Sequence, residues 1–111
     1  MTDNIVGEYI KLTSEFKNIY GNKTVVLLMV GAFYEIYAIK KNEKLVGSSI
    51  DEVSYICELN VSDKQIKYNN CPVFMCGFRD YNIDKFVQKL TNSGYTCVVF
   101  DQETDGKKIT R

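Results

Sequence analysis

Residues 23–39 contain an apolar run that stops at a glycine and then resumes as an alternating pattern. The run over residues 24–30 is too short to span a membrane and has the length of a strand buried on both faces. Gly31-Ala32 follows, and glycine in the first position of a two-residue loop suits a type II′ turn. The stretch therefore predicts a β-hairpin whose second strand begins at Phe33.

The second strand of this hairpin carries an aromatic ring and a carboxylate on one face. Side chains alternate between the two faces of a strand, so Phe33 and Glu35 share one face while Tyr34 and Ile36 share the other. We expect Phe33 and Glu35 to project from an exposed face beside the turn, and Tyr34 and Ile36 to point into the core. This aromatic and acidic pair is the strongest functional signal in the sequence.

The chain has the size and charge of one ordinary globular domain. Its 111 residues suffice for a single core, and its 14 basic and 14 acidic residues give a formal net charge of zero. A neutral chain does not hold nucleic acid by charge alone, although it can still read local shape or a base. Histidine is absent from the sequence, so no Ser-His-Asp or Cys-His triad is available. The composition leans away from an enzyme.

Four cysteines are present, and their spacing lacks the paired CxxC knuckles of zinc sites: Cys57, Cys71, Cys76 and Cys97. We expect reduced, structural thiols and no metal. Asp3 and Glu8 lie where a signal peptide would be apolar. Both observations favour an intracellular protein, without distinguishing cytoplasm, nucleus or organelle.

Three stretches have helical patterns. Apolar residues at helical spacing predict an N-terminal helix that ends before Gly21: Ile5, Tyr9, Leu12, Phe16 and Ile19. Ser49 and Glu52 have the spacing of a capping box at the start of a short second helix. Asn82 is a suitable N-cap for a third helix, which closes at Asn92-Ser93-Gly94.

Further strands are expected between these helices. Apolar runs predict them at residues 71–77 and 95–100, and a short strand at residues 45–46 pairs back on the hairpin. Residues 62–70 are polar and form a loop or an exposed hairpin, and no closing element is expected after Asp101. Strands interleaved with about three helices predict a single α/β domain with a mixed β-sheet.

Gly31-Ala32-Phe33-Tyr34-Glu35 resembles the Gly-Asp-Phe-Tyr-Glu signature of the N-terminal mismatch-recognition domain (domain I) of the MutS family of DNA mismatch repair proteins. The resemblance covers nearly the whole chain, apart from a longer middle between Tyr37 and Cys71. It extends to Tyr9-Ile10-Lys11-Leu12, to Met75-Cys76-Gly77-Phe78, to residues 83–90 with Asn92-Ser93-Gly94, and to Cys97-Val98-Val99-Phe100-Asp101-Gln102. Ala32 departs from the family's aspartate, and Arg79 from a proline.

The resemblance implies a non-catalytic domain that tests duplex DNA for mispairs, at the front of a longer DNA-clamping ATPase. Residues 1–111 would then be a domain excised from that protein. No cofactor is implied here, whereas ATP and Mg would bind the missing C-terminal ATPase. The implied partners are mismatched double-stranded DNA and the other domains of the parent chain, which would be dimeric; a membrane is not implied.

The resemblance also assigns roles to the hairpin pair. In the family, the phenylalanine that matches Phe33 enters the minor groove and stacks on a mispaired base, where unstacking costs less because pairing is already broken. Glu35 would accept a hydrogen bond from a base N–H that correct pairing occupies, and its repulsion would disfavour matched DNA. From the strand pattern alone, a core Phe33 and a solvated Glu35 are the ordinary interpretations.

Two other functions fit the same fold. In a protein-interaction or structural module, Phe33 would contact a partner or another domain. A nuclease-like or nucleotide-binding domain ranks last, because the sequence lacks a glycine-rich phosphate loop and a cluster of metal-binding carboxylates. Several isolated cations are more simply ordinary surface residues than phosphate contacts: Lys64, Lys67, Arg79, Lys107 and Lys108.

Overall fold

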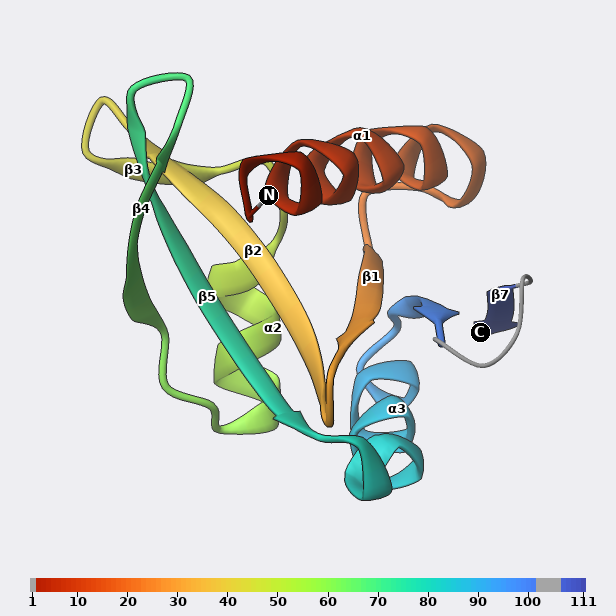
Figure 1. The fold of residues 1–111 in the computed structure, drawn as a ribbon. Helices are drawn as coiled ribbons and strands as arrows, with labels where there is room; N and C mark the ends of the chain where they lie inside the picture. Colours follow the sequence, from red (N-terminus) through yellow and green to blue (C-terminus); the bar gives the residue numbers. More distant parts are fainter. Residues whose placement is uncertain (1, 102–106) are drawn as a thin grey trace.

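A single mixed β-sheet forms the centre of the protein (Figure 1). The computed structural model describes residues 2–101 and 107–111, with the side chains of residues 5–101 and 108–111. Within these residues the strands are β1 (Thr24–Val30), β2 (Phe33–Lys41), β3 (Lys44–Val46), β4 (Ser62–Tyr68), β5 (Cys71–Arg79), β6 (Thr96–Phe100) and β7 (Lys107–Thr110). The helices are α1 (Thr2–Tyr20), α2 (Ile50–Cys57), the 3-10 turn η1 (Asp80–Asn82) and α3 (Ile83–Asn92).

The strands are ordered β4-β5-β2-β1-β6-β7, and the short β3 pairs with β2. Only the β1–β6 pair is parallel among the strands described; the other pairs are antiparallel. The expected single α/β domain with a mixed sheet and three helices is therefore confirmed. None of the helices in the described residues is both long and apolar enough to cross a membrane.

The two faces of the sheet are covered by different helices. On one face, the ring of Tyr9 from α1 meets that of Tyr37 from β2 edge-on at 5.4 Å, and the Tyr9 hydroxyl donates to the Val26 carbonyl at 2.8 Å. On the other face, the ring of Phe78 from β5 lies 4.4 Å from that of Phe86 from α3 in a tilted arrangement, and α2 packs beside α3. Helices therefore lie against both faces of the central strands.

The buried face of α1 differs from the expected stripe at its C-terminal end. Tyr9 and Phe16 are buried, but Ile19 is 64% exposed, and Val6 and Thr13 complete the buried face instead. A helix turns by about 100° per residue, so Ile19 lies at the margin of the surface centred on Tyr9. The helix ends at Tyr20 and is followed by Gly21 with a positive φ, as predicted.

The predicted capping box of α2 does not form. Ser49 makes no side-chain capping bond; its Oγ accepts a hydrogen bond from Lys17 Nζ at 2.6 Å. Glu52 accepts one from the Tyr95 hydroxyl. Both side chains were matched to a local motif, but their partners come from distant parts of the chain and tie α2 to α1 and to the residue before β6.

Two edge strands extend the sheet beyond the apolar segments. Residues 62–70 contain β4 and the turn Asn69-Asn70, in which both residues have a positive φ, so the exposed-hairpin alternative is correct. The expectation of no closing element after Asp101 is wrong, because β7 pairs antiparallel with β6. Its segment Lys107–Thr110 has one apolar residue, so backbone pairing rather than its own apolar pattern places it in the sheet.

All four cysteines are free thiols. Burial raises the pKa of Cys57 to about 11 and those of Cys76 and Cys97 to about 12, whereas Cys71 is only half-buried, at the start of β5. Because the thiolate is the nucleophile, a raised pKa leaves little reactive form at pH 8. We therefore expect iodoacetamide to add one adduct to the native protein, at Cys71, and four in urea, measured by intact mass. A Cys71–Cys76 bridge would contradict this expectation.

Candidate nucleic-acid interface

The β1–β2 hairpin ends in a tight turn at Gly31-Ala32. Gly31 has a φ of 63° and Ala32 lies outside the left-handed region, which agrees with the predicted type II′ turn, and Val30 pairs with Phe33 across it. The Asp80 backbone N–H donates to the Ala32 carbonyl at 2.8 Å. The turn is thereby fixed to the chain that leaves β5, although Ala32 lacks the carboxylate found in the MutS signature.

Phe33 is the first residue after the turn and is 42% exposed. Tyr34 and Ile36 are buried on the opposite face, so the predicted orientation of these three side chains is confirmed. Behind Phe33, the rings of Tyr34 and Phe78 lie 5.8 Å apart across β2 and β5. The exposed ring therefore rests on a strand end whose other face is packed into the core.

Glu35 shares the face of Phe33, but its predicted exposure is wrong: the residue is only 8% exposed. The Tyr37 hydroxyl donates a hydrogen bond to Glu35 Oε1, and α1 covers Tyr37 through Tyr9. Burial, and then the contact with Glu35, raise the pKa of Tyr37, so this hydroxyl remains a donor at neutral pH. The alternation of side chains along a strand determines which face Glu35 lies on. Its exposure depends on whether another element, here α1, covers that face.

Gly77 makes room for this carboxylate. It lies opposite Glu35 in the β2–β5 register, and a Cβ atom at position 77 would lie 3.5 Å from Glu35 Cγ and 2.6 Å from the Tyr34 carbonyl oxygen. The second distance is shorter than any real Cβ contact. In the sequence, Gly77 is recognisable only as part of the motif that resembles the family. Its position opposite Glu35 depends on the register of β2 and β5.

Removing the Tyr37 hydroxyl should destabilise the protein. In Tyr37→Phe the buried Glu35 carboxylate loses its donor, which costs about 1–3 kcal/mol in free energy of unfolding, measured by urea denaturation at pH 7. Tyr95→Phe is the matched control, because Tyr95 donates to Glu52, whose side chain is about half exposed, and water can replace the bond. Equal losses in the two variants would show that Glu35 does not depend on Tyr37.

Arg79 and Tyr81 enlarge the exposed surface beside Phe33. The Arg79 guanidinium lies 5.2 Å from the centre of the Phe33 ring and 5.4 Å from that of Tyr81, which is 73% exposed. The sequence indicates Arg79 as one of several surface cations and gives no prediction for Tyr81. An aromatic residue in the polar segment Arg79–Asn82 was the available signal.

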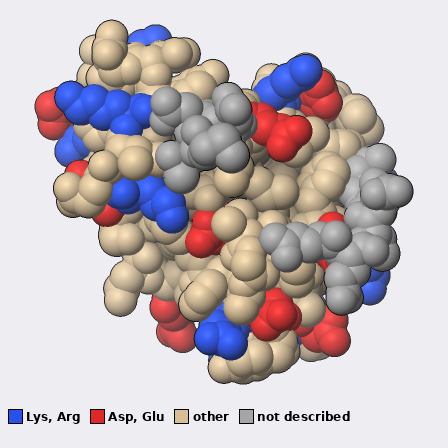
Figure 2. Space-filling model, viewed as in Figure 1, with Lys and Arg blue, Asp and Glu red and all other residues tan. Residues whose placement is uncertain are grey.

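The remaining candidate cations are scattered. Lys64 and Lys67 lie on β4 and Lys108 on β7, which are the two opposite edges of the sheet, while the side chain of Lys107 lies outside the described residues. On the face that Figure 2 shows, Lys and Arg are interspersed with Asp and Glu. These positions do not form a continuous basic stripe, so they do not define a track for a DNA backbone.

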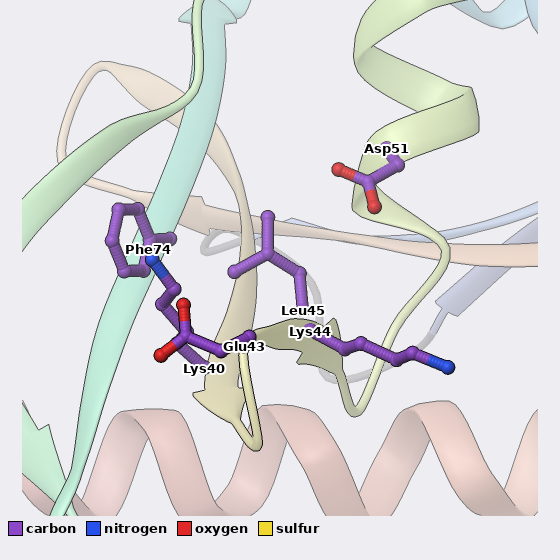
Figure 3. A pocket seen from close by; sticks show the side chains of 6 residues that line it. All are labelled: Lys40, Glu43, Lys44, Leu45, Asp51 and Phe74. Atoms are coloured by element: carbon purple, nitrogen blue, oxygen red, sulfur yellow. The ribbon is translucent and has the colours of Figure 1, made fainter.

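A separate pocket lies at the other end of β2, and Figure 3 shows the side chains that line it: Lys40, Glu43, Lys44, Leu45, Asp51 and Phe74. The Lys40 Nζ atom lies over the Phe74 ring, 5.8 Å from its centre. The positive charges of two lysines are balanced by the negative charges of two carboxylates, so the pocket does not favour an anion such as phosphate. Among the described residues no group of three or more His, Cys, Asp or Glu side chains could hold a metal ion.

The fold and this site define an α/β domain that presents an exposed ring and a shielded carboxylate at the end of a β-hairpin. The model of the MutS domain I family matches residues 9–111, and the chain belongs to that family. It is 32% identical over 110 residues to a DNA mismatch repair protein mutS homologue of Acanthamoeba polyphaga mimivirus, covering 98% of this chain and 10% of that protein. It is 25% identical over 101 residues to DNA mismatch repair protein MutS of Staphylococcus aureus, covering 91% of this chain and 10% of that protein.

These comparisons confirm the family resemblance inferred from the sequence. They also show that the chain spans about a tenth of the length of the curated relatives it matches.

Proposed function

We propose that this chain reads mismatches in double-stranded DNA as the non-catalytic domain I of a MutS-type mismatch repair protein. The observation that carries the proposal is the partly exposed Phe33 at the tip of a rigid hairpin, in a chain of the MutS domain I family. Both relatives described above are named as DNA mismatch repair proteins. Phe33 would act as a wedge that enters the minor groove and stacks on a mispaired base.

The packing around Phe33 supports a wedge. Inserting a ring between base steps costs a few kcal/mol of unstacking per step, so the ring needs a support that does not give way. The Ala32 carbonyl is bonded to Asp80, and Tyr34 on the opposite face packs on Phe78. A mismatch lowers the unstacking cost, and discrimination then follows from local deformability rather than from sequence.

Glu35 is proposed to contact the displaced base. Tyr37 occupies Oε1, and a carboxylate can accept further hydrogen bonds at Oε2. An unpaired base offers an N–H group, whereas a correctly paired base has its N–H groups occupied. Because Glu35 is buried, its carboxylate would form a hydrogen bond with a base only at close range, after Phe33 has been inserted.

The rest of the proposed protein would supply affinity and ATP hydrolysis. The formal net charge of this chain is zero, so phosphate contacts contribute little to its binding. We propose a longer, dimeric parent whose other domains enclose the duplex and whose ATPase binds ATP and Mg. The domain described here would contribute recognition of the mispair.

Glu35→Gln tests the carboxylate role in the full-length protein. Glutamine retains the size of the side chain and removes its charge, so affinity for matched duplex should rise and the mismatch-to-match ratio should fall. One charge near phosphates changes binding by about 1 kcal/mol, or roughly fivefold. Fluorescence-polarisation titrations with matched and G·T-containing duplexes measure both affinities. Glu52→Gln on α2 is the matched control, and an unchanged ratio in Glu35→Gln would remove Glu35 from the recognition site.

A further inference from the structure

Arg79 lies close to two exposed aromatic rings at the hairpin tip. Its guanidinium is 5.2 Å from the centre of the Phe33 ring and 5.4 Å from that of Tyr81. Among the described residues, each of the other cations that lie over a ring does so over one ring only, as Lys40 does over Phe74. Arg79 makes no ion pair with a carboxylate in the described part of the chain, so its charge remains available to a ligand.

The backbone fixes this arrangement. Arg79 pairs with Phe33 in the β2–β5 register, and the next residue, Asp80, donates its N–H to the turn at Ala32. The backbone of Arg79 therefore cannot separate from that of Phe33 without breaking the end of the sheet. Tyr81 follows within η1, so the second ring beside the guanidinium comes from a segment anchored to the same turn.

A group 5.2 Å from the Phe33 ring lies within reach of the groove that this ring would enter. The minor groove is about 6 Å wide, comparable to the distance between the Phe33 ring and the guanidinium. Arginine is planar, weakly hydrated and always charged, and it stacks well on aromatic faces. A narrow minor groove at A·T pairs has an enhanced negative potential that attracts inserted arginine side chains.

We propose that Arg79 is a second DNA-contacting residue, which enters the minor groove beside Phe33 and favours mispairs flanked by A·T pairs. Tyr81 keeps the guanidinium in place when the Phe33 ring leaves it to stack on a base. The inference rests on the proposed function, because it requires Phe33 to enter the minor groove. It explains how a chain with no net charge places a positive group at the point of insertion.

The test compares two mismatched duplexes that carry the same G·T mispair, one flanked by A·T pairs and the other by G·C pairs. The full-length protein should bind the first more tightly. Arg79→Gln should lower affinity for the A·T-flanked duplex by about fivefold, the lower end for a specific Arg contact, and abolish the preference. It should also reduce the slope of log affinity against log salt by about 0.9, the contribution of one cation.

Matched variants separate this role from general effects of charge and folding. Lys40→Gln makes the same charge change at the other end of β2, also beside a ring, and should retain the preference. Tyr81→Ala should weaken the preference, and Tyr81→Phe, which keeps the ring, should restore it. Thermal melting of each variant establishes that it is folded.

The outcomes distinguish this inference from the proposed function. If Arg79→Gln behaves like Lys40→Gln while Phe33→Ala loses mismatch discrimination, the wedge stands and the role of Arg79 is overturned. If Phe33→Ala retains discrimination, the proposed function fails. An unsubstituted protein that binds both flanking contexts equally also overturns the inference.

Discussion

Replacing Phe33 by alanine in the full-length protein should lower affinity for mismatched duplex by about 5- to 150-fold, because base–aromatic stacking contributes roughly 1–3 kcal/mol per base. Matched and mismatched duplexes share the same phosphate contacts, so affinity for matched DNA should change little. The mismatch-to-match ratio should therefore collapse. Competition titrations with unlabelled matched and mismatched duplexes measure this ratio directly.

The control for Phe33→Ala is another exposed aromatic residue. Tyr55 is 84% exposed and belongs to α2, away from the hairpin tip. Tyr55→Ala should therefore leave the mismatch-to-match ratio unchanged. Phe33 is itself partly exposed, so its removal should cost little stability. A Phe33→Ala protein that is folded and keeps its mismatch-to-match ratio would exclude a wedge mechanism. A protein-interaction or structural role for the exposed ring would then be favoured.

Replacing Gly77 by alanine should lower the free energy of unfolding by about 3 kcal/mol or more, at the upper end for overpacking a core. The new Cβ would lie 2.6 Å from the Tyr34 carbonyl oxygen, a backbone atom that cannot rotate away, so β2 and β5 must separate. For a domain of this size, the melting temperature should fall by about 10 °C or more. Urea denaturation and calorimetry measure both quantities.

Gly7→Ala provides the matched control for Gly77→Ala. A Cβ at position 7 would also make a close contact, at 3.0 Å, but with the ring of Tyr68, a side chain that can move. Gly7 lies inside α1, where alanine is favoured over glycine by about 1 kcal/mol. The control should therefore be neutral or stabilising. If Gly77→Ala were equally well tolerated, the close fit of β2 on β5 beneath Glu35 would be wrong.

Much of the fold follows from local patterns in the sequence. The apolar run, the glycine in the first turn position and the alternation after Phe33 predict the β1–β2 hairpin with its correct turn, because covalent geometry and sterics set the strand period and the turn type. The same alternation places Tyr34 and Ile36 on the face opposite Phe33, and both are buried. The exposure of Phe33 followed from the family resemblance, because the strand pattern alone favours a buried ring. The family follows as well, since the signature around the turn is local.

The tertiary structure decided the features that depend on distant partners. Glu35 is buried because Tyr37 donates to it and α1 covers Tyr37, and Ser49 and Glu52 bond to Lys17 and Tyr95 rather than to their own helix. In the same way, β7 exists because β6 offers it an edge, and Tyr81 reaches the site because η1 is bonded to the hairpin turn. A local period gives the direction of a side chain. Its exposure and its hydrogen-bond partners depend on which other elements pack there and where they end.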